Sequence, residues 1–171
     1  ETQPVMLRLQ SDLSLLLEAA IDGRLHEVEA EWDPRPALGV VMAAEHYPGT
    51  PRTGDVIHGL DTPVPADCKV FHAGTRLEDG QVLTAGGRVL CATALGETVA
   101  EAQRRAYAAA DAITWLGEFH RNDIGWRAIA RELIGKIPLG GGLIPKAAVA
   151  YAGTYVLGQS LDRLYKLGYG Y

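Results

Sequence analysis

The alternation of apolar and polar residues is clearest between Val82 and Trp115, where it predicts a strand followed by a helix. Residues 88–94 are apolar and rich in strand formers, and two glycines precede them. Thr98 and Glu101 then have the spacing of a capping box, in which a hydroxyl and a carboxylate accept from amides at a helix start. At steps of three and four, the helix carries one apolar stripe, which consists of Val99, Ala102, Ala106, Ala110 and Ile113. The unit reads as a scaffold, and none of its residues is arranged for bond-breaking chemistry.

The pattern before this unit predicts one helix and several strands. A helix begins after Ser11, which suits an N-cap, and ends at Gly23. Residues 37–44 are almost continuously apolar, which predicts a strand covered on both faces. Short strands separated by tight turns follow at residues 69–73, 75–77 and 81–83, and they indicate an antiparallel meander. The expected fold class is α+β, with a mainly antiparallel sheet and packed helices.

The composition changes after Leu133. Residues 135–142 include four glycines and a proline, and an apolar stretch follows at residues 147–161. We therefore expect a glycine-rich linker and an apolar helix over residues 144–165, packed or interfacial. A membrane span is the less favoured interpretation, because a helix needs roughly twenty apolar residues to cross a bilayer. Residues 133–171 carry four basic residues and one acidic residue, although the whole chain has a net charge of −5.

Composition and charge indicate an ordinary globular protein and argue against a nucleic-acid-binding protein. The chain has 171 residues, 47% of them hydrophobic and 22% charged, as in an ordinary globular protein of one domain with an appendage. Its negative charge gives no electrostatic basis for binding nucleic acid. Cys68 and Cys91 lack metal-ligand spacing, and no secretory segment precedes them, so we expect small buried thiols in the cytoplasm.

Motifs for catalysis or metal binding are weak. None of the five histidines lies three or four residues from another, so we expect no metal site. Gly140, Gly141 and Gly142 precede Lys146 but lack the Gly-Lys-Ser/Thr ending of a phosphate loop, and a linker explains them better. Residues 45–59 mix prolines and glycines with ionisable groups, which is typical of an ordered loop that carries binding groups.

A series of short motifs follows one order along residues 1–132. These include Glu1-Thr2-Gln3, Tyr47-Pro48-Gly49, Gly54-Asp55-Val56-Ile57, Val70-Phe71-His72-Ala73-Gly74-Thr75, Gly86-Gly87-Arg88-Val89-Leu90 and Asp123-Ile124-Gly125-Trp126-Arg127-Ala128. They resemble the C-terminal portion of the phosphoribosylamine–glycine ligases (glycinamide ribonucleotide synthetases), ATP-grasp enzymes of purine biosynthesis. The resemblance implies a ligase that joins glycine to phosphoribosylamine through glycyl phosphate, with ATP and magnesium as cofactors. It also implies that residues 1–30 end an ATP-grasp domain and that residues 31–132 form a small barrel-like C-terminal domain.

The chain also departs from the pattern of that family. There the run Glu-Thr-Gln closes a longer motif whose earlier Glu and Asn hold magnesium, whereas here Glu1 is the first residue. The resemblance therefore implies a fragment that is not catalytic alone, with no catalytic or metal residue and no cofactor of its own. Its partner would be the rest of the parent enzyme. We expect any substrate contact at Glu1, Gln3, Arg52, Asp55, His72 and Thr75, with Arg52 as a forked donor to phosphate. The alternative is that these are ordinary turn residues.

Residues 133–171 do not match the ligase family. Their pattern resembles the last helices of an uncharacterised, partly membrane-associated domain that follows small GTPase domains. A natural fusion, an engineered chimera and an assembly artefact all remain open. The second hypothesis for the whole chain is accordingly a non-enzymatic interaction module, whose apolar tail binds a partner, another copy of the chain or a membrane.

Overall fold

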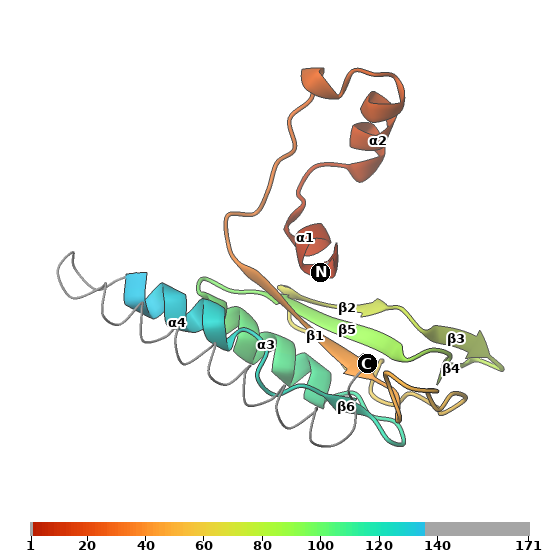
Figure 1. The fold of residues 1–171 in the computed structure, drawn as a ribbon. Coiled ribbons are helices and arrows are strands. Elements are labelled where there is room, and N and C mark those ends of the chain that lie inside the picture. Colours follow the sequence, from red (N-terminus) through yellow and green to blue (C-terminus); the bar gives the residue numbers. More distant parts are fainter. Residues whose placement is uncertain (1, 136–171) are drawn as a thin grey trace, which may run out of the picture. The chain divides into compact units, whose positions relative to one another are not determined.

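The computed structural model of the chain describes residues 2–135 (Figure 1). Glu1, all but the first residue of the expected glycine-rich linker, and the expected tail helix lie outside the described residues. The chain divides into two units, one ending at Ile124 and the other beginning at Gly125. The described part of the second unit is Gly125 and helix α4 (Trp126–Gly135). Within residues 2–135, no helix combines the length and the apolar character that crossing a bilayer requires.

The centre of the first unit is a four-stranded antiparallel sheet in the order β2-β5-β1-β6. Strand β5 is its most enclosed member, and all but the first of its residues are buried. In the register of the sheet, Ala92 lies opposite Val40 on one side and Val70 on the other. The strands are β1 (Ala37–Ala43), β2 (Cys68–His72), β5 (Arg88–Leu95) and β6 (Phe119–His120).

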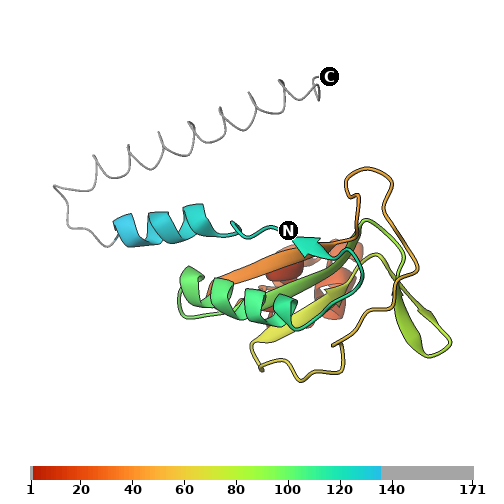
Figure 2. The same ribbon diagram turned by 90° about the horizontal axis from the view of Figure 1, so that it is seen from below.

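Helix α3 (Val99–Asp111) covers one face of this sheet along β1 and β5 (Figure 2). Its predicted stripe is confirmed, because four of the five members, Ala102, Ala106, Ala110 and Ile113, are buried in the main core, and the fifth, Val99, is partly buried against it. The predicted cap is confirmed too. The Thr98 hydroxyl accepts from the amide of Glu101 at 3.2 Å. The carboxylate of Glu101 reaches back to the amide of Glu97, one residue before the cap, at 2.8 Å.

Helix α1 (Thr2–Arg8) lies against the opposite face of β1 and β5 (Figure 1). Gly39 makes this approach feasible, because a Cβ atom there would lie 3.0 Å from Cys91 Sγ and 3.2 Å from Pro4 Cγ. Such contacts are tighter than most side chains tolerate, so the glycine leaves room for Pro4 on the sheet. The expectation that residues 37–44 form a strand covered on both faces is met by α1 and α3.

A two-stranded antiparallel ribbon of β3 (Thr75–Glu78) and β4 (Gln81–Thr84) stands apart from the larger sheet. The expected meander is therefore wrong in one respect: β2 pairs directly with β5, and the ribbon is an excursion between them. The backbones at Gly74 and Arg88 meet where the ribbon leaves the sheet, and the Gly74 amide donates to the Arg88 carbonyl at 2.9 Å. An α+β fold with a mainly antiparallel sheet is confirmed. Residues 2–135 form no closed barrel, so the barrel-like expectation is not confirmed.

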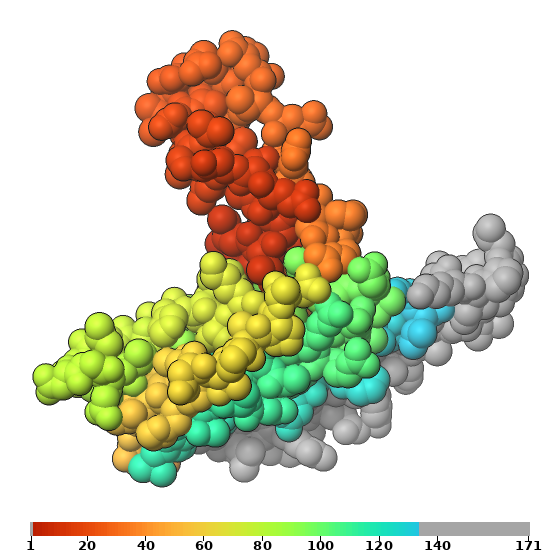
Figure 3. Space-filling model, turned by 180° about the vertical axis from the view of Figure 1, so that it is seen from behind, coloured from red at the N-terminus to blue at the C-terminus, as the bar shows by residue number. Residues whose placement is uncertain are grey.

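Residues 10–32, which we call the N-terminal lobe, extend from the sheet (Figure 3). The lobe contains α2 (Leu13–Ile21) and a short 3₁₀ helix, η1 (Leu25–Glu27). The predicted N-cap at Ser11 is wrong, because Asp12 caps the helix by accepting from the Ser14 amide at 2.8 Å. The Ser11 hydroxyl instead accepts from the amide of Glu31 at 2.7 Å.

A charged network anchors the end of the lobe to the sheet. Asp33 is buried, and its carboxylate accepts from the Arg35 guanidinium, with the shortest contact at 2.8 Å. The bond to Arg35 holds the pKa of the Asp33 carboxyl below its usual range. Arg35 also pairs with Asp67 at 3.0 Å, and Arg105 of α3 binds the other oxygen of the same carboxylate at 3.1 Å. Asp67 therefore joins the segment between the lobe and β1 to helix α3.

Candidate functional site

A cleft of about 830 Å³ lies between the first turn of α1 and the sheet, and we call it the α1 cleft. Its lining is largely polar, and it contains residues from α1, β1, β5 and the loops at their ends. The lining consists of Thr2, Gln3, Val41, Tyr47, Ala73, Gly74, Gly87, Arg88, Leu90 and Cys91. In a concave site a few polar groups fix the orientation of a ligand, and here Thr2, Gln3, Tyr47 and Arg88 supply such groups.

The ring of Tyr47 packs against Gly87 at one side of the cleft. A Cβ atom on residue 87 would lie 2.5 Å from Cδ2 of that ring, so only glycine leaves the ring in this position. The loop that carries Tyr47 is fixed at its base, because the Tyr47 amide donates to the Ala44 carbonyl at 3.1 Å. The Ala44 amide in turn donates to the Gly87 carbonyl at 2.9 Å. Gly87 thus leaves room for an aromatic side chain at the cleft.

Arg88 brings a positive charge to the cleft. Its side chain is exposed and makes no ion pair within residues 2–135. A guanidinium presents donors in a planar fork that fits a phosphate or a carboxylate. Sequence reasoning did not select Arg88. The available signal was its place directly after Gly86 and Gly87, at the start of a strand.

Three of the six predicted substrate-binding residues lie at or beside the cleft. Gln3 lines it. His72 and Thr75 flank Ala73 and Gly74, which also line it, and His72 Nδ1 lies 3.0 Å from the Thr75 hydroxyl oxygen. This hydrogen bond between two side chains closes the turn in which Ala73 and Gly74 line the cleft. The fourth predicted residue, Glu1, lies outside the described residues.

Arg52 and Asp55, the other two, are not among the residues that line the cleft. The guanidinium of Arg52 pairs with Asp55 at 3.0 Å and with Glu45 at 3.5 Å. The amide of Asp55 donates to the buried hydroxyl of Thr84 at 3.1 Å. These contacts close the loop that carries Tyr47. The predicted phosphate donor Arg52 therefore forms two ion pairs within its own loop, and its side chain remains 43% exposed.

Among residues 2–135, no acidic side chain lines the cleft, and the cysteine that lines it, Cys91, is buried. Cys68 and Cys91 are free and buried, as small hydrophobic residues would be. Burial raises the pKa of the Cys68 thiol, which keeps it protonated. Within residues 2–135, no group of three or more His, Cys, Asp and Glu side chains has the arrangement of a metal site. The chemistry that the cleft offers is recognition of an anionic, hydrogen-bonding ligand.

Comparison with known proteins identifies the family. Residues 37–127 match the family model described as phosphoribosylglycinamide synthetase, C domain. The chain belongs to this family. It is 67% identical over 133 residues to the phosphoribosylamine–glycine ligase of Xanthomonas campestris and 64% identical over 132 residues to that of Pseudomonas putida. Each alignment covers 77% of this chain and 31% of the relative. The resemblance found in the sequence is confirmed.

A solved structure supports the same relationship. The phosphoribosylamine–glycine ligase of Thermotoga maritima is similar to this chain with a TM-score of 0.50 and 34% sequence identity. The similarity covers 63% of this chain and 27% of that chain. The present chain thus spans less than a third of the length of the relatives that it matches.

Proposed function

We propose that the chain is the C-terminal part of a phosphoribosylamine–glycine ligase and that its α1 cleft forms one wall of the substrate site. The observation that carries the proposal is Arg88, an exposed guanidinium without an ion-pair partner in the described part of the chain, in a polar cleft. Phosphoribosylamine and its glycyl product both carry a phosphate, and a forked guanidinium is suited to bind one.

The neighbours of Arg88 complete this wall. Gln3 can donate to and accept from a ribose hydroxyl, because a side-chain amide has both kinds of group. Tyr47 supplies an aromatic surface and a phenolic hydroxyl. His72 and Thr75 hold the turn beside the cleft, and Arg52 and Asp55 hold the loop that carries Tyr47. In this proposal the last two position the site and do not touch the phosphate.

The rest of the ligase is the proposed partner, and the N-terminal lobe is the proposed contact surface. Large apolar side chains of the lobe are exposed in this chain, and Ile21 is 84% exposed. The other members are Leu13, Leu15, Leu17, Leu25, Val28 and Trp32. A cluster of exposed apolar side chains of this kind marks a surface that another polypeptide covers. ATP and magnesium would bind to that remaining part, in the cytoplasm.

The proposed site can be tested by titrating the isotope-labelled chain with glycinamide ribonucleotide and following amide chemical shifts. We expect saturable shifts at residues 73–74 and 86–88. Arg88→Gln should weaken binding by about tenfold or more, as expected when a charge-assisted hydrogen bond is lost. Arg76→Gln is the matched control, because Arg76 lies on the β3–β4 ribbon and pairs with Glu78 at 2.9 Å. Shifts confined to other residues, or equal weakening by both variants, would remove the α1 cleft from consideration.

The alternative of a non-enzymatic interaction module rests on the tail, which lies outside the described residues. An activity measurement separates the two functions. The chain is mixed with the preceding part of the Xanthomonas campestris relative, expressed as a separate polypeptide, and ADP release is followed with ATP, magnesium, glycine and phosphoribosylamine. Turnover that requires both polypeptides supports the ligase proposal. Turnover equal to that of the preceding part alone contradicts it.

A further inference from the structure

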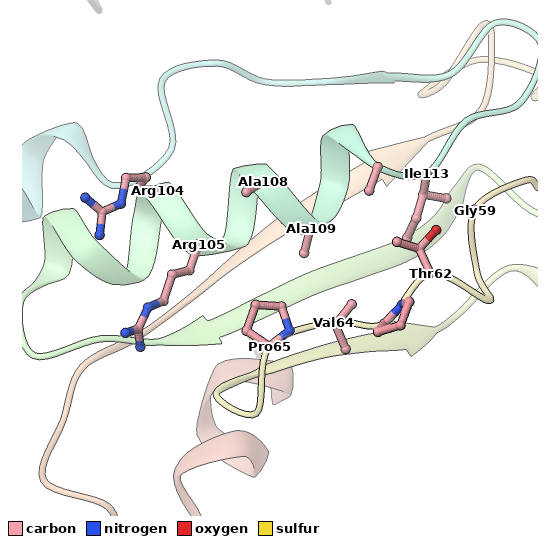
Figure 4. Close-up of a pocket in the computed structure, with 11 residues that line it drawn as sticks. Gly59, Thr62, Val64, Pro65, Arg104, Arg105, Ala108, Ala109 and Ile113 are labelled. Carbon is pink, nitrogen blue, oxygen red and sulfur yellow. The ribbon is translucent and has the colours of Figure 1, made fainter.

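A second hollow lies along the outer side of α3, and we call it the α3 groove (Figure 4). Its volume is about 400 Å³, and its lining is almost entirely apolar. Ala108, Ala109 and Ala112 of the helix form one side of the groove, which we call the alanine floor. Pro63, Val64 and Pro65 form the facing side, which we call the proline wall. None of these residues lines the α1 cleft, so the groove is a separate feature of the same unit.

The groove exists because small residues stand where the helix faces the 59–65 segment. Ala108 and Ala112 are exposed, and their methyl groups are too short to reach the proline wall and fill the space. The segment is pinned at one end, where the His58 amide donates to the Thr114 carbonyl at 2.9 Å. At Gly59 a Cβ atom would collide with the carbonyl oxygen of Ala112, so glycine lets the backbone pass. Fixed backbone thus closes the groove at its Thr62 and Ile113 end.

Arg104 and Arg105 lie at the opposite end of the groove, which we call its mouth (Figure 4). Arg105 is already engaged, because its guanidinium bonds to Asp67 at 3.1 Å, to the Leu95 carbonyl at 3.0 Å and to Glu101 at 3.0 Å. The side chain of Arg104 is 77% exposed, and its nearest carboxylate is that of Glu101, at 3.8 Å. That carboxylate also accepts from Arg105 and from the Glu97 amide. Arg104 therefore keeps donors available at the mouth.

We propose that the α3 groove binds a small amphipathic anion. Its apolar body lies on the alanine floor against the proline wall, and its carboxylate or phosphate meets Arg104 at the mouth. The volume falls in the range of small-molecule sites, about 300–1,000 Å³, which are mostly apolar with a few polar groups that fix orientation. The charge at the open end selects the sign of the head group. A cation of the same length places its charge beside two arginines and is disfavoured.

The test uses the full chain and two probes with the same eight-carbon tail, octanoate and octylamine. We expect octanoate to give saturable amide shifts within residues 59–65 and 104–113, with octylamine weaker there by about fivefold or more, the ratio that an exposed charge contact of about 1 kcal/mol produces. Equal affinity of the two probes at these residues would overturn the proposal. Octanoate shifts confined to the N-terminal lobe would overturn it as well, because the lobe also exposes apolar side chains.

Two kinds of variant separate the contribution of the alanine floor to binding from the contribution of the charge of Arg104. Ala108→Phe places a ring in the groove from an exposed position, so it should abolish the saturable octanoate shifts while the melting temperature stays unchanged. Ala112→Phe, at the other exposed floor position, is the second blocking variant should the first melt lower. Arg104→Gln should weaken octanoate about fivefold and leave octylamine unaffected or tighter. Arg76→Gln, far from the groove in sequence and paired with Glu78, is the control. Unchanged octanoate binding in both phenylalanine variants would contradict the proposal.

Discussion

Gly87 and Tyr47 are fitted to each other, because a Cβ atom on residue 87 would come within 2.5 Å of the tyrosine ring. Gly87→Ala should displace the ring, lower stability by about 1 kcal/mol through overpacking, and weaken glycinamide ribonucleotide binding in the α1 cleft. Removing the ring as well, in Gly87→Ala/Tyr47→Ala, should recover the stability lost through the added methyl group. Chemical denaturation of the two single variants and the double variant gives the coupling. Strictly additive free energies would show that the two residues do not interact.

The contact between α3 and the sheet can be tested at two neighbouring alanines. Ala106 is fully buried against the sheet, whereas Ala108 is exposed on the same helix. Ala106→Asp should therefore lower the free energy of unfolding by about 3 kcal/mol or more, since it buries a charge without a partner. Ala108→Asp changes helix propensity by the same amount but leaves the charge in water, so its effect should stay below about 1 kcal/mol. Similar melting curves for the two variants would contradict the packing of α3.

The β5–α3 unit was predictable because its signals are local. Thr98 caps the helix three residues before Glu101, and the stripe of Ala102 and Ala106 repeats at helical spacing. Such patterns state which face will be buried without reference to the rest of the fold. The pairing of β2 with β5 was not predictable in the same way. Tight turns suggested a meander, and nothing local indicates that the chain returns to β2 after the ribbon.

The candidate site residues also divide into those that local sequence patterns indicate and those that depend on the fold. Arg52 was predicted as a phosphate donor because it lies in a polar loop, and the folded loop places Asp55 and Glu45 within ion-pair distance of its guanidinium. Arg88 shares the cleft with Thr2 and Gln3 of α1, which lie far from it in sequence, so no local pattern indicates that they come together. The exposure of the apolar side chains of α2 could not be predicted from the sequence pattern either. Its apolar spacing resembles that of a packed helix, yet within residues 2–135 the side chains of Leu17 and Ile21 remain 55% and 84% exposed.

The Asp33–Arg35 contact predicts a pH dependence of stability. Arg35 holds the pKa of Asp33 below its usual range in the folded chain. The ionised carboxylate therefore contributes stability above the ordinary value of about 4, and this contribution is lost as the pH falls through the lower, folded-state pKa. The difference in unfolding free energy between the parent chain and Asp33→Asn should thus be largest near neutral pH and shrink in acid. Urea denaturation from about pH 7 to about pH 3 measures it.

The matched control is Asp61→Asn, which changes an exposed carboxylate with no ion pair in the described part of the chain. Its difference from the parent should stay constant over the same range of pH. A constant difference for Asp33→Asn as well would mean that the contact with Arg35 adds no stability in solution.

The N-terminal lobe gives the sharpest test of the proposed partner. Ile21 on α2 is 84% exposed, and Leu77 on the β3–β4 ribbon is 74% exposed, so a lysine at either position should leave the chain's own melting temperature nearly unchanged. If the lobe packs against the rest of the ligase, only Ile21→Lys buries a charge in that contact. Calorimetric titration with the preceding part of the Xanthomonas campestris relative should then show at least about tenfold weaker binding for Ile21→Lys, as for a central interface residue. Leu77→Lys should bind like the parent chain. Equal affinity of both variants for the preceding part would show that Ile21 is not in the contact. It would contradict the proposal that the lobe is the contact surface.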